Sequence, residues 1–214
     1  MTIKGGMTKM KLELSEMQLD ALREVGNIGA SHAATALSEM LGGRVDLSLP
    51  GIDIVPMVEF NKLLTTDEEG VNYMLTLNGE INSVIILHFS GETKNTLGNF
   101  LVTGSPESPG EIDEMTREMM DSAIQEVSNI LVSQAADAFA SLLDFKMTPS
   151  TPKKMKMGLT AGDLGPHADE IHPEAILLDA HLKASELEAD TKFYIVPFKS
   201  SVGNLLEKLG VSNL

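Results

Sequence analysis

One polar pattern occurs twice in this sequence, and its two copies stand in strict register. Each copy has Asp or Ser, then Glu four residues later, Asn three residues after the Glu, and Pro twenty-three residues after the Asn. The members are Asp20, Glu24, Asn27 and Pro50 in the first copy and Ser122, Glu126, Asn129 and Pro152 in the second. The offset from Glu24 to Glu126, 102 residues, is the same for every member. A chain with this repeat has to build the same local structure twice, so we expect an internally duplicated fold.

The repeat constrains the domain organisation. The chain has 214 residues, of which 43% are hydrophobic, enough for a sizeable core but short for two independent domains and a linker. We predict a single domain over residues 1–214, made of two repeats at about 15–103 and 111–214. The segment Gly104–Gly110, which contains Pro106 and Pro109, is the best candidate for the connection between them.

Composition excludes several classes of function. The absence of cysteine excludes disulfides, thiol catalysis and cysteine metal sites, as expected for a reducing cytoplasm. Residues 1–11 lack the apolar segment of a secretory signal, and no later run approaches the roughly 20 apolar residues that span a bilayer. The formal net charge of −15 disfavours nucleic acid and anionic membranes and favours a protein partner with a basic rim. We therefore expect a cytoplasmic protein with no nucleic-acid or membrane partner.

Helix and strand signals follow one order in both repeats. In the first, Ser15 and Gln18 form a capping box, apolar residues continue at helical spacing to Met40, and Gly42 and Gly43 end the helix. Extended segments are predicted at 44–49 and 52–58, strands at 71–77 and 83–89 around an Asn-Gly turn, and a short helix at 92–102.

In the second repeat, a helix from about 111 to 143 precedes a strand-like segment at 146–157. A polar loop at 158–173, strands at 175–182 and 192–198, and a helix at 202–209 follow. The sequence thus predicts an α+β fold, with a β-sheet, two long helices that carry the repeated residues, and shorter helices. We expect the two halves to be related by a pseudo-twofold axis.

The repeated polar residues lie on one face of each long helix. Positions i, i+4 and i+7 of a helix fall within about 60° of one another, so each Asp/Ser, Glu and Asn forms one stripe. Apolar residues such as Leu22, Val25, Ala33 and Ala36 occupy the opposite face, so the stripes should be in water. A single exposed stripe of this kind is commonly there for solubility alone. Asn, however, is a poor helix former, and its retention in both copies has no stability rationale.

These residues resemble the CheC/CheX/FliY family of chemotaxis phosphatases. The family motif is Asp or Ser, three residues, Glu, two residues, Asn, about twenty-two residues and Pro, and both copies match it. The resemblance covers essentially the whole chain, and two copies in a chain of this length are most similar to the CheC branch. It implies an internally duplicated CheC-like fold.

The resemblance also implies a function, which is hydrolysis of the aspartyl phosphate on the response regulator CheY. Carried over by position, Glu24 and Glu126 pair with the regulator's active-site lysine, and Asn27 and Asn129 reach the phosphorylated aspartate. Asp20 and Ser122 occupy the variable first position. The chain itself is expected to hold no metal and no cofactor, with Mg²⁺ bound by the regulator. We expect a monomer.

The chemistry is consistent with these residue types. An acyl phosphate has a good carboxylate leaving group, so its hydrolysis mainly requires a water held in line with the departing oxygen. A neutral Asn can orient that water, whereas a second carboxylate would be repelled by the phosphoryl group. A Glu can make a charge-assisted contact with a lysine and so set the register of the docked helix. An alternative function, a binding adaptor for CheY and the receptor deamidase CheD, needs the Glu residues but not the Asn residues.

Other residues receive simpler interpretations. Pro50 and Pro152 are expected to end or bend the strand after each helix and to set the hairpin that supports it. Ser31 and Ser133 also repeat, but no His and Asp pair accompanies them, so we expect them to pack near small alanines. The five histidines lack zinc spacing; His167 and His172 share an acidic loop that is only a weak cation candidate. The methionines favour core filling over an adaptable docking surface.

Overall fold

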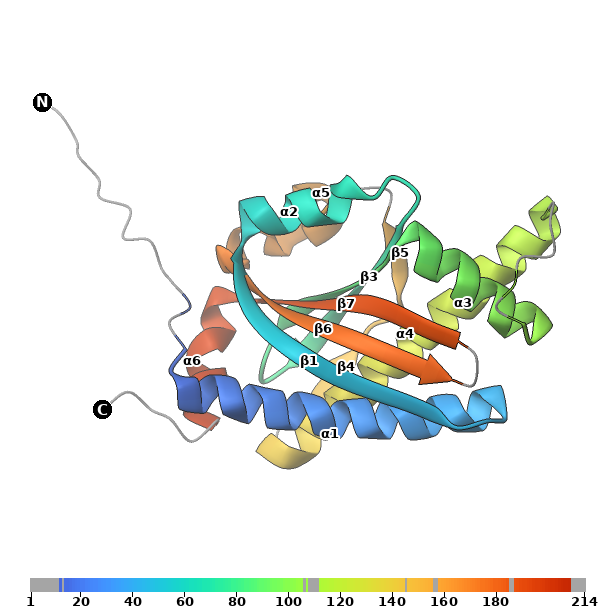
Figure 1. Cartoon of the computed structure of the whole chain (residues 1–214). Helices are drawn as coiled ribbons and strands as arrows, with labels where there is room; N and C mark the ends of the chain where they lie inside the picture. The colour runs from blue at the N-terminus through green and yellow to red at the C-terminus, as the bar shows by residue number, and fades with distance from the viewer. Residues whose placement is uncertain are drawn as a thin grey trace, which may run out of the picture.

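The computed structural model describes residues 12, 14–105, 107, 112–144, 146–155, 158–184 and 187–208 (Figure 1). The first half of the chain forms α1 (Glu16–Leu41), β1 (Val45–Pro56), α2 (Met57–Thr66), β2 (Val71–Gly79), β3 (Ser83–Phe89) and α3 (Gly91–Thr103). The second half forms α4 (Glu114–Leu143), β4 (Met147–Pro149), β5 (Lys153–Met155), α5 (Ala161–Leu164), the 3-10 helix η1 (Gly165–Glu170), β6 (Glu174–Ala184), β7 (Leu187–Pro197) and α6 (Lys199–Lys208). The mixed α+β composition is as predicted.

The strands form one antiparallel sheet whose order is symmetrical between the two halves. The order is β1-β6-β7-β3-β2-β4, and β5 also pairs with β2. If β1 is matched to β4 and β5, β2 to β6, and β3 to β7, exchange of the halves leaves this order unchanged. Each edge is therefore closed by a strand from the opposite half: β1 pairs with β6, and β4 and β5 pair with β2. This arrangement agrees with the predicted pseudo-twofold duplication.

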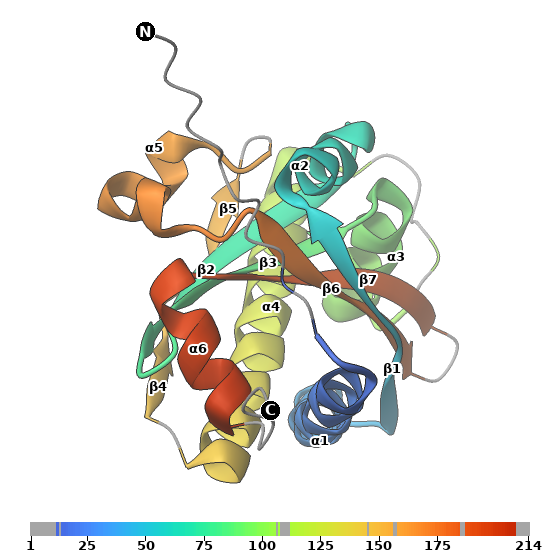
Figure 2. The same ribbon diagram turned by 90° about the vertical axis from the view of Figure 1, so that its left-hand side faces the viewer.

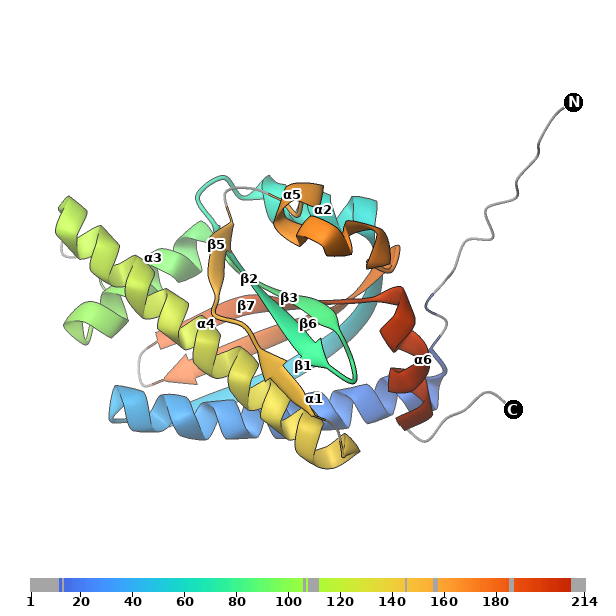
Figure 3. The ribbon, with the colours of Figure 1, turned by 180° about the vertical axis from the view of Figure 1, so that it is seen from behind.

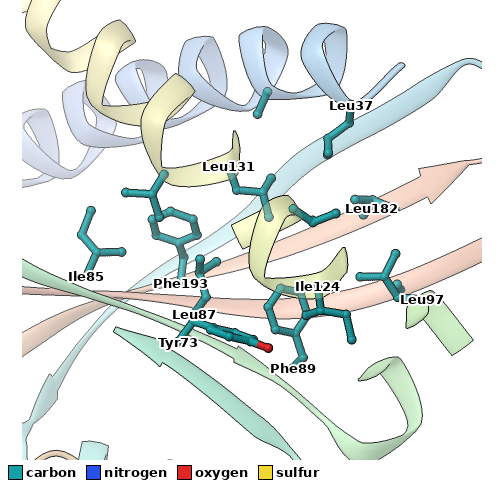
Figure 4. Packing of buried hydrophobic residues seen from close by; sticks show 14 of the residues in the cluster. Leu37, Tyr73, Ile85, Leu87, Phe89, Leu97, Ile124, Leu131, Leu182 and Phe193 are labelled. Atoms are coloured by element: carbon teal, nitrogen blue, oxygen red, sulfur yellow. The ribbon is translucent and has the colours of Figure 1, made fainter. Parts of the chain in front are cut away.

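The two long helices cover one face of the sheet, and α2 with α5 covers part of the other (Figures 1 and 2). Between the long helices and the sheet, Leu37 of α1 and Ile124 and Leu131 of α4 are buried together with Leu87 and Phe193 of the strands (Figure 4). Burial of each such side chain stabilises the fold by about 1.5–3 kcal/mol, so this layer fixes where the long helices lie.

Local signals at the ends of the long helices agree with the sequence. Ser15 and Gln18 form a reciprocal capping box at the start of α1, and Gly42 ends the helix with a left-handed φ of 65°. At the start of α4, the side chain of Asp113 accepts a hydrogen bond from the Thr116 N–H. Both long helices therefore begin and end close to the predicted positions.

Several segments differ from the predictions. The extended segment predicted at 52–58 ends at Pro56, where α2 begins, because Phe60 and Leu64 bury one face of that helix against Tyr194 and neighbouring strand residues. The polar loop predicted at 158–173 contains α5 and η1, and the start of α5 is capped by Thr160. The strand predicted at 192–198 begins earlier, at Leu187.

Two further expectations concern the connection and the membrane. Of the connection predicted at Gly104–Gly110, residues 106 and 108–110 lie outside the described residues. Among the helices of the described part of the chain, none combines the length and the apolar character needed to cross a bilayer.

Candidate functional site

The repeated polar residues stand on the outer side of α1 and α4. On α1, Asp20, Glu24 and Asn27 are all exposed. On α4, Ser122 and Glu126 are exposed and Asn129 is half-buried. The opposite face of α1 is buried at Leu22, Val25 and Ala33, and Ala36 is half-buried. The prediction that the stripes stand in water is therefore confirmed for α1 and for Ser122 and Glu126 of α4, whereas Asn129 is partly covered.

The two stripes belong to helices that cross closely (Figure 3). A Cβ placed on Gly29 of α1 would lie 3.0 Å from the Cα of Ala135 and 3.6 Å from the Cβ of Ala138, both on α4. The backbones of α1 and α4 can approach this closely because Gly29 has no side chain. The two site-bearing helices thus pack directly against each other over the sheet.

The cavity behind the helices does not contain the motif residues. It has a volume of about 70 Å³, and its lining is apolar and rich in small residues, including Gly26, Ala33 and Ala136. Glu24, Asn27 and their matches on α4 are outside this lining. The stripes are therefore open surfaces, and a reaction there needs a macromolecular partner to enclose it.

The surroundings of the two stripes differ in charge. On α1, the Arg23 guanidinium lies 2.6 Å from a carboxylate oxygen of Asp20, within the stripe. On α4, Asp121 stands one residue before Ser122, and it pairs at 2.5 Å with the ammonium group of Lys154 from β5. All four side chains are 43–70% exposed, so each pair contributes about 0–1 kcal/mol to stability. The pairs matter more for what a partner meets: a cation on the helix itself in the first copy, and one on the neighbouring strand in the second.

The two prolines interrupt the edge strands, as predicted. Pro50 is exposed and lies at a register shift in the pairing of β1 with β6, between Ser48 and Gly51. Pro152 is buried between β4 and β5. Pro50 lies in the edge strand β1 and Pro152 in the break between the edge strands β4 and β5, positions at which a residue without an N–H is tolerated. The expected supporting hairpin is wrong, because β1 continues into α2 and pairs with β6 from the other half.

One contact of Pro152 was not expected from the sequence. Its carbonyl oxygen accepts a hydrogen bond of 3.1 Å from the side-chain amide of Gln125, the residue before Glu126. At the matched position of α1 stands Arg23, which pairs with Asp20 instead. The sequence shows that different residues, Arg23 and Gln125, precede the two Glu residues. The spacing of the motif does not predict which group either side chain contacts.

Several secondary expectations are also decided. Ser31 is exposed and Ser133 is half-buried, so the expectation that Ser31 packs among alanines is wrong. Met120 and Met155 fill the core, whereas Met119 is exposed; Met157 lies outside the described residues. Within the described part of the chain, no three His, Asp or Glu side chains gather closely enough to hold a metal ion. The expectation that Mg²⁺ belongs to the partner stays a prediction.

Comparison with known proteins finds similarity to one family of chemotaxis proteins. Residues 17–53 and 119–155 each match the CheC-like family, so the two matched segments carry the same 102-residue offset as the motif. The chain is 25% identical over 213 residues to the CheY-P phosphatase CheC of Bacillus subtilis (strain 168). This alignment covers 93% of this chain and 97% of that protein. It is 24% identical over 148 residues to the flagellar motor switch phosphatase FliY of the same organism. That alignment covers 69% of this chain but only 38% of FliY.

The fold has a counterpart among solved structures. FliY of Thermotoga maritima superposes with a TM-score of 0.69 and 22% sequence identity, over 92% of this chain and 98% of that one. The overall fold of this chain therefore has a counterpart in a known structure.

Proposed function

This chain belongs to the CheC-like family, and we propose that it is a phosphatase that hydrolyses the aspartyl phosphate of the phosphorylated response regulator CheY. The observation that carries the proposal is the accessible Glu and Asn that both long helices present at matched positions. Similarity over 97% of a CheY-P phosphatase supports the choice of substrate. An open site of this kind is complete only when the regulator docks on it.

In this proposal Glu24 and Glu126 anchor the regulator. Both carboxylates are exposed, and neither has an ion-pair partner among the described residues. Each is thus available for a charge-assisted hydrogen bond to a lysine of the partner. Because the Glu stands one helical turn from the Asn, this bond sets where the Asn lies over the phosphoryl group.

Asn27 and Asn129 position the nucleophile. A water held by the carboxamide attacks phosphorus, the bond from phosphorus to the aspartate oxygen breaks, and the products are inorganic phosphate and the regulator's free carboxylate. The amide oxygen accepts a hydrogen bond from the water, and the amide N–H groups can donate to a phosphoryl oxygen. No group of this chain needs to change its protonation state, since the aspartate is a good leaving group. Mg²⁺ on the regulator would neutralise the developing phosphoryl charge.

The experiment is the decay of phosphorylated CheY with an Asn27→Ala, Asn129→Ala double variant. We expect the rate of phosphate release to fall about a hundredfold, because a mispositioned nucleophile costs that much. Binding of the regulator, measured separately, should persist because both Glu residues remain. Asn95→Ala is the matched control, since Asn95 is an exposed helical Asn on α3 and lies outside the motif. The two single variants rank the two sites.

The same measurement separates the phosphatase from the adaptor alternative. If the double variant releases phosphate as fast as the wild type, the chain acts by binding alone and the catalytic role of the Asn residues is rejected. Binding to CheD stays a prediction that this assay does not address.

A further inference from the structure

The repeated face of each long helix is longer than the motif. One turn before Asp20 and Ser122 stand Met17 and Met119, which are separated by the same 102 residues. Both are exposed, Met17 to 68% and Met119 to 53%. A matched pair of apolar side chains in water extends the two stripes toward the start of each helix.

Helix geometry places each methionine on the same face as its Glu and Asn. The spacing Met17, Asp20, Glu24, Asn27 advances by three, four and three residues, so the four side chains fall within about 80° around α1. On α4 the spacing from Met119 is identical. Each methionine lies ten residues before its Asn, which is about 15 Å along the helix.

Stability does not account for the two exposed side chains. On α4, Met120 is buried with 5% exposure, so the core takes one of two adjacent methionines and leaves the other outside. The N-terminal turns of both helices are already secured by the caps of Ser15 and Asp113. A flexible thioether in water is, in contrast, well suited to an adaptable contact with a partner.

We propose that Met17 and Met119 are apolar anchors for the response regulator at the two sites. This inference rests on the proposed function. The occupant follows from continuity: a stable interface covers about 800 Å² of each partner, so a regulator that reaches Glu24 and Asn27 also covers a side chain 15 Å away on the same face. The regulator surface that meets each site therefore presents a cation to the Glu and an apolar side chain to the Met.

The experiment is steady-state hydrolysis of phosphorylated CheY by a Met17→Ser, Met119→Ser double variant. The anchors contribute equally to the ground state and the transition state, so we expect KM to rise about fivefold and kcat to stay unchanged. Met40→Ser is the matched control, because Met40 is also exposed on α1 but points about 140° away from Met17. It should leave KM unchanged. A Met17→Leu, Met119→Leu variant keeps the apolar contact and should restore the wild-type KM.

The outcomes separate this inference from the proposed function. Wild-type protein that releases no phosphate rejects the function itself. Wild-type hydrolysis with an unchanged KM in the double serine variant rejects the anchors and leaves the function standing. A KM that rises equally in the serine and leucine variants rejects the apolar character of the contact. Thermal unfolding of each variant checks that the exposed substitutions leave the fold intact.

Discussion

Single residues make the two copies of the site unequal. Gln125 ties α4 to the edge strand through the carbonyl of Pro152, next to Glu126. Arg23, its match on α1, is instead engaged with Asp20 and makes no bond to Pro50 among the described residues. A neutral hydrogen bond contributes only about 1 kcal/mol, so the consequence is less for stability than for position. The backbone next to Glu126 is therefore tied to the segment between β4 and β5, whereas the hydrogen bond from the Val45 N–H of β1 to the Ser38 hydroxyl of α1 lies fourteen residues after Glu24.

A buried histidine on the opposite face of the sheet makes stability depend on pH. His88 of β3 is 8% exposed, and its Nδ1 donates a 2.8 Å hydrogen bond to the side-chain oxygen of Asn72 on β2. Asn72 in turn donates to the carbonyl oxygen of Leu64 in α2. Burial lowers the pKa of His88, and the nearby Lys192 lowers it further, while Asp67 opposes the shift.

The sign of this effect follows from proton binding. As the pH is lowered below the unfolded histidine pKa of about 6.5, the unfolded chain binds a proton at His88 that the folded chain does not bind. The free energy of unfolding therefore decreases as the pH is lowered. We expect the free energy of unfolding, measured by denaturant titration, to decrease between about pH 7 and pH 5, and this decrease to shrink in a His88→Gln variant. A His32→Gln variant, at an exposed histidine of α1, should retain the wild-type pH dependence. An identical pH slope in the His88 variant would contradict the assignment.

At the scale of elements, the crossing of α1 and α4 sets how the two sites are held. Replacement of Gly29 by Ala puts a methyl group 3.0 Å from the backbone of Ala135, so the helices have to move apart. We expect the free energy of unfolding to fall by about 1–3 kcal/mol, as for other overpacked cores, measured by chemical denaturation.

Gly26→Ala on the same helix is the matched control. Its new methyl group meets the end of the Leu49 side chain at 2.8 Å, which can rotate away, unlike backbone. The gain in helix propensity, about 1 kcal/mol, is the same in both variants, so the difference in their stability reports the contact at the crossing. Gly29→Ala should therefore be clearly less stable than Gly26→Ala, and equal stability of the two variants would show that the crossing is looser than its geometry indicates.

Elements differ in how far the sequence predicts them. The long helices were predictable because caps, apolar spacing and a 102-residue repeat all agree. The same repeat correctly marked Glu24, Asn27 and Glu126 as exposed, whereas Asn129 is half-buried. α2 was missed because only Phe60 and Leu64 bury its face, too few to give a helical period. The pairing of β1 with β6 joins residues more than a hundred positions apart, and no local pattern encodes it.

For the whole molecule, the sheet binds the two halves into one folding unit. Its outer pairs each combine strands from different halves, and so does the central pair of β3 with β7. A separated first half would keep the β2–β3 hairpin but leave β1 without its partner β6. It would also expose the apolar face that α4 covers, including Leu87 and Val71.

These losses give a prediction for fragments 15–103 and 111–214, which also tests the single-domain organisation. Each fragment alone should lack cooperative unfolding, because an isolated hairpin with a helix cannot bury enough apolar surface to offset chain entropy. Mixed or co-expressed fragments should form a one-to-one complex that unfolds cooperatively, since every strand then regains its partner. Circular dichroism and thermal melts of each fragment, of the mixture and of the intact chain measure this. A first fragment that melts cooperatively by itself would show that the exchanged edge strands are not required, and that the repeats fold as separate units.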